Sequence, residues 1–176
     1  MQGDEYCDIY DADRNFTGRT RRRGGLYAPG DFFLVVHVWI MNSRGEYLIT
    51  QRAPEKKAYP LLWEAPGGSV LAGEGSLSAA LRETMEETGI ALRPEDGVLF
   101  TTWRRPDSFA DVWLFRQEVS LGDFVPRPGE TIAARLALPE EILAMQRAGK
   151  FFRNAYMEEM FQFAIDNCCA YPGSGI

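Results

Sequence analysis

Short apolar stretches alternate with polar turns along this chain, and most of them are typical of strands. The longest, FFLVVHVWI at 32–40, is almost wholly apolar and rich in β-branched and aromatic residues, which predicts a strand buried on both faces. The segment NSRG at 42–45 predicts a hairpin turn to a partner strand at 46–52. The other predicted strands are an edge hairpin at 6–23 and runs at 98–105, 109–119 and 131–138.

Three further segments have the period of a helix. In the first, at 76–88, apolar residues recur at steps of three and four, and Ser76 is the predicted N-cap. The second covers 139–147, and a final amphipathic helix follows Asn154, its predicted N-cap. No repeat or linker interrupts the pattern, so we expect one α/β domain over 1–176, with helices layered on a mixed sheet.

The composition is typical of one globular domain, and the net charge limits the kinds of partner that the chain is expected to bind. Of the 176 residues 45% are hydrophobic, and 19 basic against 25 acidic residues leave a net charge of −6. Such an acidic chain is not expected to bind nucleic-acid polymers or anionic membranes by general attraction. No apolar run approaches the roughly 18 residues of a membrane helix, and the first residues lack a secretory pattern, so we expect a cytoplasmic protein.

Cysteine and histidine are too few for a disulfide framework or a structural zinc site. Cys7, Cys168 and Cys169 show no CxxC spacing, and His37 is the only histidine. Reduced thiols are therefore expected. Because His37 lies within an apolar strand, we interpret it as a core residue rather than a ligand or base.

The helix predicted at 76–88 carries three glutamates beside its apolar face. Glu83, Glu86 and Glu87 fall on an arc of roughly 100°. A solvated acidic face is the simpler interpretation, but it explains the pattern poorly, because Glu83 and Glu87 form a like-charge i,i+4 pair with no lysine on that arc. Clustered carboxylates suit a hard divalent cation such as Mg²⁺, which also binds the phosphates of a substrate.

The stretch from Gly68 to Ile90, GSVLAGEGSLSAALRETMEETGI, resembles the Nudix box. One position departs from that pattern, since Thr84 stands where a larger apolar residue is usual. The resemblance implies a Nudix-type α/β/α sandwich with a mixed β-sheet, and an enzyme that hydrolyses the diphosphate bond of a nucleoside diphosphate linked to another group. The fixed positions of the box are met by Gly68, Glu74, Arg82, Glu83, Glu86, Glu87, Gly89 and Ile90.

The same resemblance implies a Mg²⁺ or Mn²⁺ site on the glutamate helix. Its ligands would be the carbonyl of Gly67 with Glu86 and Glu87, and Glu83 would be a further ligand or the general base. Gly67 and Gly68 allow the backbone to come close to that site.

Other residues of the chain receive supporting or catalytic roles from the resemblance. Arg82 would orient Glu83, and Glu74 would pair with Arg82, while Gly68, Glu74 and Gly89 would be structural. The family's general base often lies on a late loop, where Glu130 is the nearest candidate. A surface glutamate is the alternative interpretation of Glu130.

The N-terminal half is also similar to the branch that includes isopentenyl-diphosphate isomerases. Arg52 and Lys56 match positions that bind diphosphate there, and Pro60 and Trp63 match later landmarks. That isomerase needs a cysteine just after the tryptophan and several histidines, which this chain lacks, so isomerase chemistry is disfavoured. The resemblance leaves Arg52 and Lys56 as phosphate-binding candidates in a hydrolase, with solvent-exposed basic residues as the alternative. A non-catalytic module that senses a nucleotide is the third possibility.

Several features remain open at the level of sequence. The basic cluster of Arg19, Arg21, Arg22 and Arg23 is either a solvated loop or a phosphate contact. Trp103 is the best candidate for stacking on a base, although a core role is the simpler one, and Asp111 is either a structural hydrogen-bonding residue or a pocket residue. The aromatic residues of the last helix, Tyr156, Phe161 and Phe163, suggest a homodimer, because they exceed what one core is expected to bury.

Overall fold

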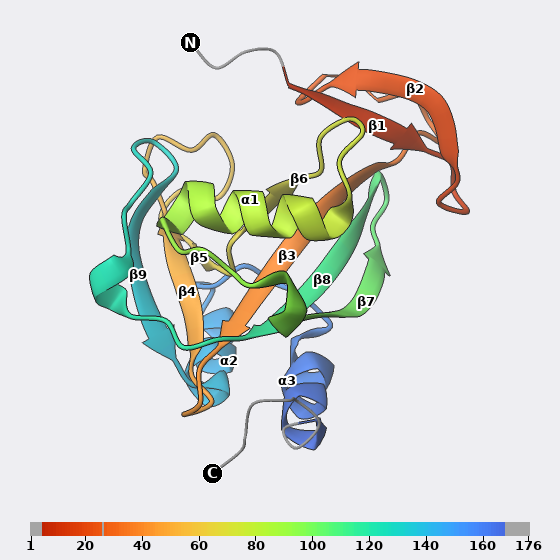
Figure 1. The fold of residues 1–176 in the computed structure, drawn as a ribbon. Helices are drawn as coiled ribbons and strands as arrows, with labels where there is room; N and C mark the ends of the chain where they lie inside the picture. The colour runs from red at the N-terminus through yellow and green to blue at the C-terminus, as the bar shows by residue number, and fades with distance from the viewer. Residues whose placement is uncertain (1–4, 26, 168–176) are drawn as a thin grey trace.

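A computed structural model describes residues 5–25 and 27–167 and shows a mixed β-sheet between two layers of helices (Figure 1). Helix α1 covers one face, and α2 and α3 cover the other. Cys168, Cys169 and the predicted end of the last helix lie outside the described residues. The helices are α1 (Ser76–Thr88), α2 (Pro139–Arg147) and α3 (Met157–Asp166), with short 3₁₀ turns η1 (Pro94–Asp96) and η2 (Leu121–Asp123).

Seven of the strands form the main sheet, and two form a separate hairpin. The order in the main sheet is β5-β4-β3-β8-β7, with β6 paired to β3 and β9 paired to β4. Only β3 and β8 are parallel, so the predicted mixed sheet is present. The strands are β1 (Tyr6–Tyr10), β2 (Phe16–Arg22), β3 (Phe33–Met41), β4 (Tyr47–Arg52), β5 (Trp63–Glu64), β6 (Gly67–Ser69), β7 (Gly97–Arg104), β8 (Ser108–Arg116) and β9 (Thr131–Ala137).

Strands β3 and β4 separate soon after the hairpin turn that joins them. Their only ladder pair is Met41 with Tyr47. Further along, β4 pairs with β5, and β3 pairs with β6, so the segment that contains β5 and β6 fills the space between the two strands. The sequence predicts this segment as a loop rich in proline and glycine, because strands of two and three residues leave no periodic pattern.

Alternate residues of β3 contribute to two cores on opposite faces of the sheet. Val36 and Val38 pack with α1, whereas Trp39 packs with α2 and α3. The aromatic residues of the last helix region also belong to the second core, where Tyr156 and Phe161 are almost fully buried. The protein's own core therefore accounts for Tyr156 and Phe161, whereas Phe163 is half-buried, and the homodimer stays a prediction.

The start of the last helix differs from the sequence prediction. Helix α3 begins at Met157, and its N-cap is Tyr156 rather than Asn154. The backbone amide of Asn154 donates to Gln146 Oε1 at 3.1 Å, which holds this residue outside the helix. Among the residues that the structure describes, none of the helices is long and apolar enough to cross a membrane.

Candidate active site

Helix α1 presents the predicted acidic residues at the edge of the β3–β6 pair. It covers the residues predicted from its periodicity, and Gly89 ends it in the left-handed conformation at φ 73°, where its N–H donates to Met85 O. The N-cap, however, is Gly75, and the predicted cap Ser76 is the first helical residue, whose Oγ accepts from Trp113 Nε1 at 2.8 Å. Thr84 is fully buried, and its hydroxyl donates to Ala80 O at 2.8 Å.

The two glycines of β6 allow the helix and the strand to approach closely. A Cβ on Gly68 would lie 2.3 Å from the carboxyl group of Glu83, and a Cβ on Gly67 would lie 2.1 Å from Val36 O. No larger residue fits at either position without displacing backbone or the carboxylate. Gly67 therefore brings its backbone to the acidic face, where its N–H donates to Glu87 Oε2 at 3.2 Å.

Arg82 connects the loop before α1 with the acidic face. Its Nε and Nη2 donate to the two oxygens of Glu74, each at 2.9 Å, and Nη2 also donates to Ser69 O at 3.0 Å. Burial alone would raise the pKa of Glu74, but hydrogen bonds from Arg82 and the Leu71 amide lower it. Arg82 Nη1 lies 3.0 Å from Glu83 Oε1, so this side chain contacts both glutamates.

Glu83 and Glu87 are buried carboxylates, with 3% and 8% of each residue exposed. Burial raises the pKa of Glu83 against the opposing effect of Arg82. Burial also raises the pKa of Glu87 to about 8, and the charges of Glu64 and Glu83 add to the shift. Glu83 Oε1 forms an ion pair with Arg82 but accepts no well-aligned hydrogen bond from the described residues. The positive charge near Glu83 and Glu87 therefore does not fully compensate the two carboxylates.

Glu86 is the most exposed of the three helix glutamates and is held by arginine. Arg127, on the loop before β9, donates to Glu86 Oε2 at 2.6 Å, and Arg82 Nη1 lies 3.6 Å from Oε1. Within residues 5–25 and 27–167, no group of three or more His, Cys, Asp or Glu side chains is arranged to hold a metal ion. The donor set is chemically suited to a hard cation, but Glu86 would have to leave Arg127 to join it.

Sequence reasoning missed a fourth carboxylate, Glu64 of β5. Burial raises its pKa, while Arg52 opposes the shift through an ion pair of 2.7 Å between Nη1 and Oε1. Arg52 also donates to Ala58 O. The position of Glu64 directly after Trp63 is a local signal, but its nearness to Glu87 depends on the pairing of β5 with β4, which periodicity does not reveal.

The late-loop candidate Glu130 lies near this acidic group and is itself paired. Its carboxylate accepts a hydrogen bond from Lys56, and its charge raises the pKa values of Glu64 and Glu87. The structure thus brings Glu130, Lys56, Glu64 and Glu87 into one electrostatic neighbourhood. Both basic candidates, Arg52 and Lys56, are neutralised by carboxylates of the chain itself.

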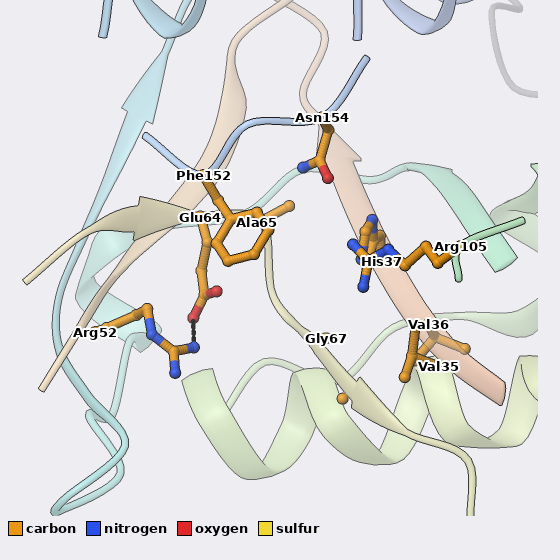
Figure 2. A pocket seen from close by; sticks show the side chains of 11 residues that line it. Val35, Val36, His37, Arg52, Glu64, Ala65, Gly67, Arg105, Phe152 and Asn154 are labelled. Carbon is orange, nitrogen blue, oxygen red and sulfur yellow. Dashed lines mark hydrogen bonds and ion pairs between the residues drawn. The ribbon is translucent and has the colours of Figure 1, made fainter. Parts of the chain in front are cut away.

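A cavity of about 190 Å³ opens where β3 and β4 separate, and we call it the interstrand cavity (Figure 2). Figure 2 shows Arg52 and Glu64 on one side of it and His37 and Arg105 on the other. The lining residues are Val35, Val36, His37, Arg52, Glu64, Ala65, Gly67, Gly68, Arg105, Phe152 and Asn154.

His37 is not the simple core residue that its apolar strand suggests, because its ring lines the interstrand cavity. Its Nδ1 lies 2.5 Å from Tyr156 Oη, and Arg105 Nη2 lies 3.0 Å from its Nε2. Burial, with a further effect from Arg105, lowers the pKa of His37 to about 3, so the ring is neutral near pH 7. The regular alternation of side chains along β3 predicts which face of the sheet His37 occupies. The cavity beside it is formed only in the tertiary structure.

The other candidates are explained by structural contacts. Asp111 is fully buried, where it accepts from Arg14 Nη2 at 2.6 Å and from Thr102 Oγ1 at 2.7 Å, so its role as a hydrogen-bonding residue prevails. Trp103 is 40% exposed and lies beside Tyr156 rather than in the interstrand cavity.

In the basic cluster, Arg19, Arg21 and Arg23 form ion pairs with carboxylates. Arg19 and Arg21 pair with Asp31, at 2.6 and 3.8 Å, and Arg23 pairs with Glu5 at 2.7 Å. The charge of Arg23 also opposes the rise that burial causes in the pKa of Glu83, so this hairpin contributes to the electrostatics of the site.

Comparison with known proteins agrees with this fold and site. Residues 31–158 match the family model described as NUDIX domain. An uncharacterised Nudix hydrolase of Listeria monocytogenes is 34% identical over 158 residues, which cover 89% of this chain and 94% of that protein. The phosphatase NudJ of Escherichia coli is 34% identical over 106 residues, covering 59% of this chain and 67% of NudJ.

Solved structures show the same fold at lower identity. A Deinococcus radiodurans protein, DR0079, superimposes with a TM-score of 0.71 at 22% identity, covering 90% of this chain and 98% of its own. A MutT protein of Methanosarcina mazei gives a TM-score of 0.60 at 24% identity, covering 82% and 99%. Because the family match spans most of the chain and the Listeria relative aligns along nearly its full length, this chain belongs to the Nudix family and is an enzyme, a Nudix pyrophosphohydrolase.

Proposed function

We propose that this Nudix hydrolase depends on Mg²⁺ or Mn²⁺ and cleaves the diphosphate bond of a small molecule, a nucleoside diphosphate linked to another group. The observation that carries the proposal is the set of carboxylates beside Gly67, at the mouth of the interstrand cavity. Glu83 and Glu87 are buried beside each other, and burial raises the pKa of both although Arg82 pairs with Glu83. A divalent cation relieves such repulsion and attracts the phosphates.

The proposed metal ligands are the Gly67 carbonyl with Glu83, Glu86 and Glu87. When bound, the cation neutralises phosphate oxygens and lowers the pKa of a coordinated water. Arg127, which now pairs with Glu86, would be released toward the phosphates when Glu86 turns to the metal. Arg82 would keep Glu83 in place through its second contact with Glu74.

Two residues compete for the role of general base. Glu83 is buried against Gly68, and burial raises its pKa, which favours it as the group that accepts a proton from water. Glu130 is held by Lys56 and becomes available only if Lys56 turns to a phosphate. Arg52, which lines the interstrand cavity, is the proposed substrate contact on the same side.

Substitution of the proposed ligands tests the metal site. Glu86→Gln and Glu87→Gln should retain the fold and lose at least about 100-fold in phosphate release, because each removes a charged ligand. They should also bind Mn²⁺ more weakly, as followed by its electron paramagnetic resonance signal. Glu158→Gln, at an exposed site on α3, is the matched control. Full activity in both folded ligand variants would refute the proposal.

The substrate is best found by comparing classes of diphosphate compound. ADP-ribose, dinucleoside polyphosphates, nucleoside triphosphates, nucleotide sugars, NADH and coenzyme A can each be incubated with Mg²⁺ and analysed for phosphate products. We expect turnover of at least one class and none in excess EDTA. Tight nucleotide binding with no product from any class would instead identify a sensing module.

A further inference from the structure

Two arginines line the interstrand cavity, and among the described residues only one of them pairs with a carboxylate. Arg52 forms an ion pair with Glu64 at 2.7 Å. Arg105, on the opposite wall, has no carboxylate partner among the described residues; its side chain donates instead to a neutral ring, His37 Nε2 at 3.0 Å. A guanidinium beside a cavity wall loses hydration, and without an anion nearby that loss is not compensated.

The position of Arg105 is fixed at both its backbone and its side chain. Its amide donates to Ser108 O at 2.8 Å, closing the turn between β7 and β8. From there the side chain reaches past β8 to His37 on β3. Such an extended arrangement costs rotamer entropy, and a hydrogen bond to a neutral acceptor offsets only part of it.

The hydrogen bonds of His37 fix its tautomer, in which Nε2 accepts a hydrogen bond from Arg105. Arginine can only donate, so Nε2 of His37 must carry the lone pair and Nδ1 the proton. Nδ1 then donates to Tyr156 Oη at 2.5 Å, and Trp39 Nε1 donates to the same oxygen at 3.3 Å. Tyr156 and Trp39 are buried core residues, so a rigid chain of hydrogen bonds anchors the guanidinium.

The same wall has a second polar group, the side-chain amide of Asn154. Asn154 is 9% exposed and belongs to the lining of the interstrand cavity. Figure 2 shows it above the interstrand cavity, near His37 and opposite Glu64. Thus the wall formed by Arg105 and Asn154 offers a positive charge that has no carboxylate partner among the described residues, together with a polar amide. The carboxylates lie toward β5 and α1 instead.

We propose that Arg105 is a specificity residue that binds a third phosphate of the substrate, beyond the diphosphate that the acidic residues bind through metal. This inference rests on the proposed function, because that function places the diphosphate at Gly67, the shared edge of the acidic site and the interstrand cavity. A substrate that spans from Gly67 to Arg105 presents its additional phosphate to the uncompensated guanidinium. Compounds with only two phosphates leave Arg105 unpaired and bind more weakly.

Inorganic tripolyphosphate and pyrophosphate test this inference without any need for turnover. Their affinities would be measured by calorimetry with Mg²⁺ in excess, for the wild type, Arg105→Gln and Arg105→Lys. The control is Arg104→Gln, because this neighbouring arginine lies over the Phe32 ring and does not line the cavity. The wild type should bind tripolyphosphate about tenfold more tightly than pyrophosphate, which is the effect of one charged hydrogen-bonded contact.

Arg105→Gln should bring that affinity ratio to about one, while Arg105→Lys and the control should retain most of it. Glutamine can still donate to His37, so a purely structural role of Arg105 predicts an unchanged ratio in Arg105→Gln. The inference would be overturned if Arg105→Gln kept the affinity ratio or lost affinity equally for both ligands. Equal affinities of the wild type for the two ligands would also overturn it. If the ratio falls as expected but no diphosphate compound is hydrolysed, the inference stands and the proposed function fails.

Discussion

The pH dependence of stability offers a direct measurement of the environment of His37. It is the only histidine of the chain, so the difference between the wild type and His37→Asn isolates one titration. Burial and Arg105 lower its pKa from 6.5 to about 3 in the folded protein. Below pH 6.5 the unfolded chain therefore takes up a proton that the folded protein refuses. The stability linked to His37 is complete above pH 6.5 and is lost as the pH falls toward 3.

The size of the loss follows from the separation of the two pKa values. Each pH unit below 6.5 costs about 1.4 kcal/mol, so at pH 4.5 the upper bound is about 2.7 kcal/mol. His37 lines a cavity that water can enter, and halving the bound for this solvation leaves about 1.4 kcal/mol. We expect wild-type stability relative to His37→Asn to fall by this amount between pH 7.5 and 4.5.

The comparison with the variant is needed because buried glutamates act in the opposite direction. Glu87, whose pKa is raised to about 8, stabilises the folded protein at low pH, and this contribution is lost as the pH rises from 4.5 through 8. Urea unfolding of both proteins, followed by tryptophan fluorescence at several pH values in EDTA, separates the two effects. The assigned environment of His37 would be refuted if the stability of the wild type relative to His37→Asn stayed constant with pH or increased toward low pH.

Three other substitutions test contacts of the fold and site. Gly68→Ala should cost about 1–3 kcal/mol in urea unfolding and most of the phosphate release, because the added methyl group meets the carboxyl of Glu83. Glu74→Gln should destabilise the protein by about 1–2 kcal/mol at pH 7, because it replaces a charged acceptor of Arg82 with a neutral one; equal unfolding midpoints in urea would contradict this. Phe161→Ala should cost about 3–5 kcal/mol, since the ring packs against buried aromatic residues, and a loss below about 1 kcal/mol would show that the core there is loosely packed.

Periodicity and one local motif predicted most of the main elements. Helix α1 has the predicted bounds because its apolar period and acidic motif coincide, and β7, β8 and β9 lie within a few residues of the predicted runs. Helix caps were less predictable. Ser76 and Asn154 are both residue types that favour N-caps, but Ser76 lies inside α1 and Asn154 lies before α3, at the interstrand cavity.

The parts of the site that sequence did not reveal depend on strand pairing. Glu64 approaches Glu87 only because β5 pairs with β4, and Arg105 reaches His37 only because β8 lies between β7 and β3. Neither relation leaves a periodic signal, since the partners are far apart in sequence. The pairing of Arg127 with Glu86 is of the same kind, because it joins the loop before β9 to helix α1.

The separation of β3 from β4 divides the site into two parts with different supports. Gly67 and His37 belong to the paired strands β6 and β3, on which α1 also packs, whereas Arg52 and Glu64 belong to the β4 side. A slight rotation of β4 about its single ladder contact with β3 would change the width of the cavity while the acidic residues kept their relation to Gly67. We therefore expect the β4 side to adapt to substrates of different size without altering the helix glutamates proposed to bind the metal.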